Sequence, residues 1–359
     1  MKVGIHTDLN NNFCNWIKRF ELILQENEIE TVRMDINQPD FWEVVKTLDL
    51  FIFRFQNIDS HHQVARSILP VIEHELKVPV FPNHRTWWAF DDKIREWFLL
   101  NAAGFPMIKS WVFFTKSEAI KWLRSAELPV VFKLKEGAGS RDVILVKSKR
   151  QASRLIDRMF YRGMLSADIK HGKKAKQKKN TLIRRIRNQA KKIVGWINKD
   201  YDPRFWQIQK NYMYFQNFLP NNNYDTRITV IGKRAFAFRR YNRKGDFRSS
   251  GSGLIDYDQS KIDLRFVKLA FKITRHFGFQ VMTYDFLIDE NSNPQICEMG
   301  YTFLDEAVYN VPGYYEENLK LITGHHWPQE YILKDLLGTE ALIIPDEERM
   351  TIKTILKNG

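Results

Sequence analysis

Cysteine is nearly absent from this chain, which has only Cys14 and Cys297 among its 359 residues. Two cysteines cannot build a disulfide framework or a four-cysteine zinc site. Apolar runs are also short, and none approaches the roughly 20 residues that a membrane-spanning helix needs. The opening residues resemble a buried strand, and Asp8 follows too early for the apolar region of a secretory signal peptide. The sequence therefore predicts a cytoplasmic protein.

Positive charge is what the chain has in excess, with 56 lysines and arginines against 42 acidic residues and a net charge of +14. This excess predicts an acidic partner, such as a nucleotide, a nucleic acid, an anionic lipid or an acidic glycan. The hydrophobic content of 44% is typical of a folded globular protein. The length allows two or three subdomains.

Strand and helix patterns alternate over residues 1–82. Apolar strands are expected at 2–6, 30–34, 50–55 and 78–81, with helices at 15–27, 41–48 and 64–74. This rhythm predicts a small parallel sheet covered by helices. Arg54 would lie at the carboxyl end of the third strand, where parallel sheets bind ligands, although a solvated charge explains it equally well.

A glycine loop is the main feature of residues 83–162. It contains Gly137, Ala138, Gly139 and Ser140 between strands expected at 130–134 and 143–146. Glycines let backbone amides turn toward an anion, although a tight hairpin explains the loop by itself. Lys133, in the apolar strand before the loop, favours an anion because a buried lysine is costly without a counter-charge. Lys93, near the start of a helix expected at 92–103, is a second phosphate candidate or a surface lysine.

Residues 163–200 differ in composition from the rest of the chain. Six lysines crowd 170–179, and apolar residues recur at helical spacing over 182–197 with arginines and lysines between them. The pattern predicts a basic amphipathic helix within an insertion. Its expected partner is an anionic membrane surface or an acidic polymer, and nucleic acid is disfavoured because no stacking aromatic module accompanies the charge. A solvated helix packed on the body is the alternative.

Two carboxylates stand out in the strand-rich region 201–359. Asp285 and Glu298 lie in apolar strand segments separated by a turn at 289–294, so a hairpin would turn both toward one ion. Oxygen ligands beside phosphates are typical of a Mg²⁺ site, whereas exposed strand-end acids are the alternative. Arginines suited to phosphate or carboxylate precede them, although some would lie close together by chance in so basic a chain. They are Arg227, Arg239, Arg240 and Arg248.

In this order the residues resemble the ATP-grasp superfamily of carboxylate–amine ligases. The series runs from Asp92-Lys93 through Lys133 and the glycine loop to Gln216-Asn217-Phe218-Leu219, Asp285 and Glu298. Three further segments look like the branch that adds glutamate to ribosomal protein S6: Tyr224-Asp225-Thr226-Arg227, Arg239-Arg240 and Gly245-Asp246-Phe247-Arg248-Ser249. The resemblance covers roughly residues 80–300, apart from the basic insertion.

The resemblance implies an α/β and α+β chain with the ATP-grasp fold. An N-terminal small parallel-sheet domain would occupy 1–82, a helical linker with the central lid subdomain 83–162, and the basic insertion 163–200. A C-terminal mixed or antiparallel-sheet subdomain with the metal site would occupy 201–359. The implied cofactors are ATP and Mg²⁺. A carboxylate would attack the γ-phosphate to give an acylphosphate, and an amine would then displace phosphate to form an amide.

The resemblance also assigns roles to residues. Lys93 and Lys133 would bind the ATP phosphates, and the loop at 137–140 would close over them. Asp285 and Glu298 would hold Mg²⁺. Three arginines would lie near the transferred phosphate or the acceptor carboxylate, namely Arg227, Arg240 and Arg248. Four residues would frame adenine, largely through backbone groups: Gln216, Asn217, Phe218 and Leu219.

One position departs from the family, which usually has asparagine two residues after the second metal-binding glutamate. Here that position is Gly300. Water or a neighbour such as Tyr301 would replace the amide oxygen, or metal binding would be weaker.

The alternatives to a ligase are an inactive nucleotide-binding or partner-recruiting module and a nucleic-acid-binding protein. The expected substrates are an acidic glycan or peptide and an amino acid, in the cytoplasm or peripheral to the inner membrane face.

Overall fold

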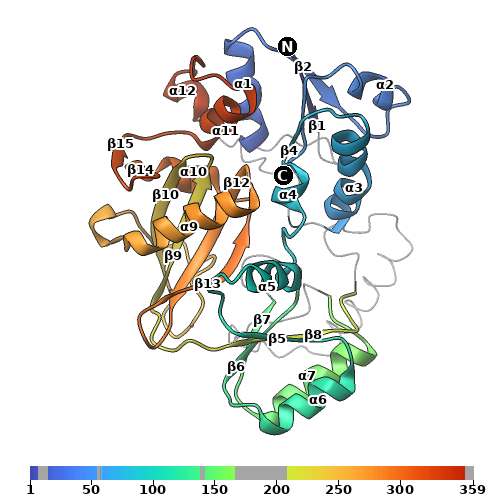
Figure 1. Ribbon diagram of the computed structural model, residues 1–359, viewed down its shortest axis with the longest axis vertical. Helices are drawn as coiled ribbons and strands as arrows, with labels where there is room; N and C mark the ends of the chain where they lie inside the picture. Colours follow the sequence, from blue (N-terminus) through green and yellow to red (C-terminus); the bar gives the residue numbers. More distant parts are fainter. Residues whose placement is uncertain (7–14, 55–56, 58, 138–141, 166–207, 352–359) are drawn as a thin grey trace, which may run out of the picture. The chain divides into compact units, whose positions relative to one another are not determined.

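The computed structural model describes residues 1–6, 15–54, 57, 59–137, 142–165 and 208–351. The chain divides into two compact units (Figure 1). Unit 1 comprises residues 1–56, 63–109 and 219–359, and unit 2 comprises residues 57–62 and 110–218. Within the described ranges, none of the helices combines the length and apolar character needed to cross a membrane.

Unit 1 begins with a four-stranded parallel sheet in the order β2-β1-β3-β4, as the alternating sequence pattern predicted. The strands are β1 (Lys2–His6), β2 (Glu30–Met34), β3 (Leu50–Ile52) and β4 (Val80–Phe81). The helical segments that follow these strands are α1 (Asn15–Glu26), α2 (Phe41–Val45), α3 (Asp59–Pro70) and a π-helical turn at Val71–Glu75.

The second sheet of unit 1 has seven strands in the order β13-β12-β9-β10-β14-β15, with β11 beside β10. Its pairs are antiparallel. The strands are β9 (Tyr224–Ile231), β10 (Arg234–Tyr241), β11 (Ile255–Asp256), β12 (Val281–Ile288), β13 (Pro294–Gly300), β14 (Gly313–Glu316) and β15 (Leu321–Thr323). The helical segments of this part are α4 (His84–Trp87), α5 (Lys93–Ala102), a 3₁₀ turn at Gln259–Lys261, α9 (Leu264–Phe277), α10 (Asp305–Tyr309), α11 (Pro328–Leu337) and α12 (Glu347–Met350).

The two faces of this second sheet have different coverings. Helix α9 packs on one face, where Phe266 stacks on Phe286 and Thr274 forms a hydrogen bond with Tyr284. On the other face, Phe236 and Val281 join the apolar cluster that also contains the first sheet and α1. Because side chains alternate along a strand, residues between the α9-facing positions must point to this other face.

Unit 2 is a four-stranded antiparallel sheet in the order β5-β8-β6-β7. Its strands are β5 (Ser110–Phe113), β6 (Val130–Lys133), β7 (Val143–Val146) and β8 (Met213–Asn217), and its helices are α6 (Lys116–Ser125) and α7 (Lys149–Tyr161). The two helices pack side by side (Figure 1). The helix predicted for 182–197 lies outside the described residues.

The sequence analysis did not predict helix α7, although a capping serine and a helical spacing of apolar residues mark it. The Ser148 side chain caps its first turn, and Ala152, Ile156 and Met159 recur at helical spacing and are buried. Gly163 then ends it in the left-handed conformation, with φ +71°.

Candidate functional site

A row of charged side chains lies on the face of the second sheet opposite α9. Asp285 on β12 is the register partner of Glu298 on β13 and of Arg227 on β9. Arg240 on β10 is the partner of Asp225, two residues before Arg227. The period of two along each strand therefore places all five on one face. The hairpin predicted for the two carboxylates is present, and its residues 285 and 298 are direct neighbours.

Two arginines hold Asp285. Its Oδ1 accepts a hydrogen bond from Arg227 Nε at 2.7 Å, and its Oδ2 accepts from Arg227 Nη2 at 2.8 Å and from Arg240 Nη2 at 2.7 Å. Burial by itself would raise the pKa of Asp285, but the charges of Arg227 and Arg240 outweigh it and lower the pKa. Asp285 is therefore a buried anion fixed between two guanidinium groups.

Arg240 also binds Asp225, so it joins two carboxylates. Its Nε donates to Asp225 Oδ1 at 2.8 Å and its Nη2 donates to Oδ2 at 2.6 Å. Burial raises the pKa of Asp225 in spite of the positive charge of Arg240. For Arg240 itself, burial favours a lower pKa, but Asp285 and Asp225 raise it. Sequence reasoning placed Asp225 in a family motif but did not anticipate that it anchors Arg240.

Lys93 reaches the same row from helix α5. Its Nζ lies 3.2 Å from Oε1 of Glu298, and its side chain is buried, whereas that of Glu298 is 36% exposed. Burial would lower the pKa of Lys93, but the carboxylates around it, Glu298 first, outweigh burial and raise the pKa. The structure thus brings together a predicted phosphate ligand and a predicted metal ligand.

Glu96 belongs to this group and was missed by sequence reasoning. It lies one turn after Lys93 on α5 and is fully buried. Its Oε2 accepts the backbone N–H of Met299 at 3.1 Å, while Oε1 has no hydrogen-bond partner among the described residues. Burial, followed by the charge of Glu298, raises the pKa of Glu96 well above the usual range. The three-residue spacing from Lys93 was the available signal.

The predicted phosphate and adenine residues are divided between the two units. Lys133 is buried in β6, and Gly137 follows at the start of the loop whose residues Ala138, Gly139 and Ser140 lie outside the described residues. Gln216 and Asn217 end β8, and the Gln216 side chain lies 3.2 Å from the hydroxyl of Tyr214. Phe218 is the last residue of unit 2, and Leu219 begins the next segment of unit 1.

The remaining predicted arginines lie apart from the Asp285 contacts. Arg248, in the loop between β10 and β11, donates to both carboxylate oxygens of Asp246 at 2.8 and 2.6 Å. This pairing lowers the pKa of Asp246. Arg239 lies on the opposite face of the sheet from Arg240, and its Nη2 is 2.5 Å from Oδ2 of Asp256.

Asp285 and Glu298 fit a metal that is bound together with a nucleotide. In the part of the chain that the structure describes, no group of three or more His, Cys, Asp or Glu residues is arranged to hold a metal. Mg²⁺ beside phosphates commonly uses only one or two carboxylates and completes its shell with phosphate oxygens and water. A carboxylate has about four lone-pair sites, so the three hydrogen bonds to Asp285 leave room for one more ligand. The two paired carboxylates therefore suit such an ion.

Gly300, the position that departs from the family, lies beside an aromatic ring. A Cβ added there would meet the Phe90 ring at 3.5 Å, an ordinary contact distance. Phe90 packs in turn against Tyr301, with ring centroids 4.7 Å apart. Tyr301, the suggested substitute ligand, is fully buried.

Comparison with known proteins shows what this chain is similar to. Residues 182–303 match the family model described as the RimK-like ATP-grasp domain. No curated protein sequence matches the chain significantly. A RimK-domain ATP-grasp protein from Sphaerobacter thermophilus is similar in structure, with a TM-score of 0.51 at 13% identity over 86% of this chain and 93% of that one.

Two further solved structures are similar over most of this chain. N5-carboxyaminoimidazole synthetase from Staphylococcus aureus has a TM-score of 0.56 at 12% identity, over 96% of this chain and 78% of that one. The biotin carboxylase domain of 2-oxoglutarate carboxylase from Hydrogenobacter thermophilus, in complex with MgADP, ADP and bicarbonate, has a TM-score of 0.54 at 13% identity, over 97% and 71%. At these identities the similarity concerns the fold, and the fold expected from the sequence is confirmed.

Proposed function

We propose that this protein is an ATP- and Mg²⁺-dependent ligase that joins a carboxylate to an amine. The ATP-grasp fold and the match to the RimK-like domain model support this proposal. The observation that carries the proposal is the charged row on the second sheet. Asp285 and Glu298 are paired on neighbouring strands, with Arg227 beside the first and Lys93 beside the second. Carboxylates for a metal next to cations for phosphate are the groups that phosphoryl transfer requires.

The cations differ in how much hydrogen-bonding capacity they retain. A guanidinium has five N–H donors, and Asp285 occupies two of those of Arg227, whose side chain is 21% exposed. Arg240 is more deeply buried and is engaged by two carboxylates. In the proposed site Arg227 therefore contacts the transferred phosphate or the acceptor carboxylate, and Arg240 positions Asp285.

Nucleotide binding would use both lysines and both metal-binding carboxylates. Lys93 and Lys133 would meet the ATP phosphates, and the carboxylates Asp285 and Glu298 would hold Mg²⁺. Bound Mg²⁺ would supply charge neutralisation between the phosphates. Gln216 and Asn217, with Phe218 and Leu219, would border the adenine ring.

The proposed reaction has two steps. An oxygen of the acceptor carboxylate attacks the γ-phosphorus, and ADP leaves with the electron pair of the broken P–O bond. The resulting acylphosphate is attacked at its carbonyl carbon by the amine, phosphate leaves, and the amine proton passes to solvent. The acceptor class that we propose is an acidic glycan or peptide, and the amine is an amino acid.

Trapping with hydroxylamine tests this proposal. The protein is incubated with ATP, Mg²⁺ and a panel of carboxylic acids, and hydroxamate and ADP are measured together. Lys133→Ala and Glu298→Ala should abolish both products, whereas Lys268→Ala on the exposed side of α9 should retain them. Absence of ADP formation across the panel would contradict a ligase.

A nucleotide-binding module without turnover is the second candidate, and Gly300 favours it. Glycine supplies no side-chain oxygen at a position where the family usually has an amide. Calorimetric binding of ATP by the intact protein, together with no ADP formation on any acid and amine pair, would support this second candidate over the ligase.

A further inference from the structure

Unit 2 presents a strongly basic surface on its helices. Arg150, Arg154, Arg158 and Arg162 follow one another at four-residue spacing along α7 and its C-terminal cap, and all four are exposed. Residues four apart lie on the same side of a helix, so at about 1.5 Å per residue these arginines form a row about 18 Å long. We call this row the arginine ladder.

Helix α6 widens the basic surface. Packed beside α7, it adds the exposed side chains of Lys116, Lys121 and Arg124. Lys116 pairs with Asp157 at 2.7 Å. By contrast, Arg150, Arg154 and Arg162 of the ladder have no carboxylate within ion-pair distance in the described part of the chain. Cations that the protein itself does not neutralise need an anionic partner or water.

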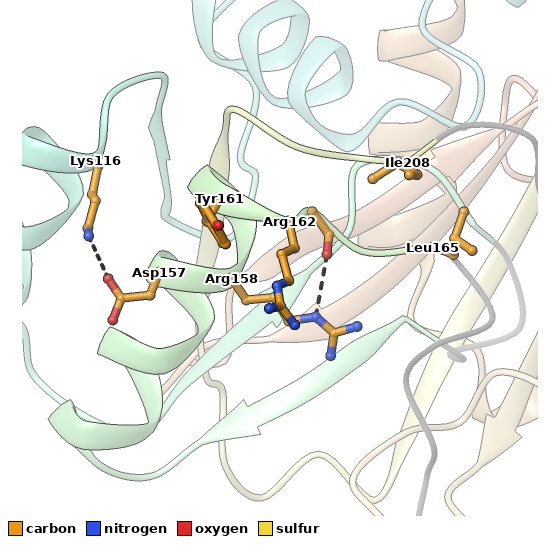
Figure 2. Close-up of a pocket in the computed structure, with 8 residues that line it drawn as sticks. Lys116, Asp157, Arg158, Tyr161, Arg162, Leu165 and Ile208 are labelled. Carbon is orange, nitrogen blue, oxygen red and sulfur yellow. Dashed lines mark hydrogen bonds and ion pairs between the residues drawn. The ribbon is translucent and has the colours of Figure 1, made fainter. Parts of the chain in front are cut away.

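A hollow of about 880 Å³ lies where the ladder ends (Figure 2). Lys116, Arg158 and Arg162 contribute positive charge to its lining, whereas Leu165 and Ile208 contribute apolar groups. Tyr161 also lines it and is 80% exposed, with the guanidinium carbon of Arg162 5.8 Å from the centre of its ring. Ile208 is 52% exposed. Basic and exposed apolar groups therefore share one rim.

Backbone hydrogen bonds join two segments that line the hollow. Met164 and Gln209 exchange two backbone hydrogen bonds of 2.9 Å. Gly163 makes this approach feasible, since a Cβ there would lie only 2.7 Å from the carbonyl oxygen of Gln209. These backbone contacts therefore hold the two segments that carry the basic and apolar residues of the rim in a fixed arrangement.

We propose that this helical face of unit 2 docks on an anionic phospholipid bilayer, with a lipid headgroup in the hollow. Basic side chains are attracted to the negative surface of such a bilayer, and tyrosine favours the headgroup level, where its ring and its hydroxyl are both satisfied. A soluble polyanion would neutralise the arginines but would leave Tyr161 and Ile208 in water. Two helices side by side also offer a broad face to a planar surface.

The first test is sedimentation of the full-length protein with vesicles. We expect binding to vesicles of phosphatidylcholine with about one third phosphatidylserine, and none to phosphatidylcholine alone. The variant Arg150→Glu/Arg154→Glu/Arg162→Glu should bind the anionic vesicles at least about tenfold more weakly. The control Lys268→Glu/Lys272→Glu/Arg275→Glu changes the net charge equally on α9 of unit 1 and should bind like the unmodified protein. Equal binding by the two variants would overturn the proposal.

The second test separates a bilayer from a soluble polyanion. Tyr161→Ser/Ile208→Ser changes two exposed side chains and leaves the charge unaltered. We expect it to weaken vesicle binding by about fivefold or more and to leave binding to soluble polyglutamate unchanged. If vesicle binding is unchanged as well, the face is a general polyanion surface and the bilayer proposal fails. Because ligase turnover is not the readout, these results are independent of the proposed function.

Discussion

Arg227 on β9 donates two parallel hydrogen bonds, of 2.7 and 2.8 Å, to Asp285 on the neighbouring strand β12. This geometry fixes the plane of the guanidinium and turns its other donors away from the carboxylate. The pair therefore joins the metal-binding carboxylate of the proposed site to the cation expected beside the transferred phosphate. Movement of one would displace the other.

Replacing Arg227 by lysine should separate charge from geometry. Lysine keeps the positive charge but cannot form two parallel bonds to Asp285. We expect Arg227→Lys to lower the rate of ADP formation by about 10²-fold while changing the free energy of unfolding little. The control is Arg239→Lys, on the opposite face of the same sheet, which should retain near-normal turnover. An equal loss of ADP formation in the two variants would show that Arg227 has no specific role in the site.

Arg240 should matter more for stability, because it lies between two buried carboxylates. Removing one partner of a buried ion pair typically costs about 3–5 kcal/mol. We expect Arg240→Met to lower the free energy of unfolding by that amount at about pH 7, measured by urea denaturation. Arg265→Met, which breaks an exposed pair with Asp263, should change the free energy of unfolding far less.

The cost of Arg240→Met should also depend on pH. Arginine neighbours lower the folded pKa of Asp285 against the effect of burial, so its stabilising contribution is complete above the unfolded value of about 3.9. That contribution is lost as the pH falls through the folded pKa. In the variant the carboxylates left behind can be neutralised by protons, so the destabilisation should be smaller near pH 4 than near pH 7. An equal cost at both pH values would contradict a buried charge network.

Glu96 gives the opposite pH dependence. Burial raises its folded pKa, so its stabilising contribution is complete below the unfolded value of about 4.3 and is lost as the pH rises through the folded value. Each unit of difference between the two pKa values corresponds to about 1.4 kcal/mol. We expect Glu96→Gln to remove most of this decline in stability as the pH rises above the unfolded value, measured by denaturation midpoints. Glu75→Gln, at an exposed site, should leave the decline unchanged.

Gly163 should be intolerant of a side chain for two reasons. Its φ of +71° strains any L-residue, and a Cβ would approach the Gln209 carbonyl oxygen to 2.7 Å. We expect Gly163→Ala to lower the free energy of unfolding by about 2–4 kcal/mol. Gly104 has a similar φ of +69° but open space around it, so Gly104→Ala should cost only about 1–2 kcal/mol. Denaturation curves that show equal losses would mean that the close approach contributes nothing.

Local pattern was enough to predict the parallel sheet and the carboxylate hairpin. The alternation around Asp285 and Glu298, with a turn between them, specifies both the pairing and the shared face. Local pattern was insufficient for contacts between distant segments. The ion pair of Lys93 with Glu298 joins residues 205 positions apart, and no periodicity in either segment encodes it.

The sequence did not predict which charged residues pair with one another. Asp285 was predicted as a metal ligand and Arg227 and Arg240 as ligands of phosphate or carboxylate, and the folded sheet also pairs these residues with one another. The burial of Glu96 could not be predicted from its place in the sequence, because burial depends on what the helix packs against. In both cases the missing information was the environment created by other elements of the fold.

The nucleotide site is tested most directly by isothermal titration calorimetry, which measures the binding of a non-hydrolysable ATP analogue in the presence of Mg²⁺. The account predicts saturable binding at one site per chain by the unmodified protein. It also predicts loss of that binding in Lys93→Met and in Lys133→Met, with the thermal unfolding midpoint and circular dichroism of Lys133→Met unchanged. Absence of binding by the unmodified protein, or equally tight binding by both folded variants, would contradict the account.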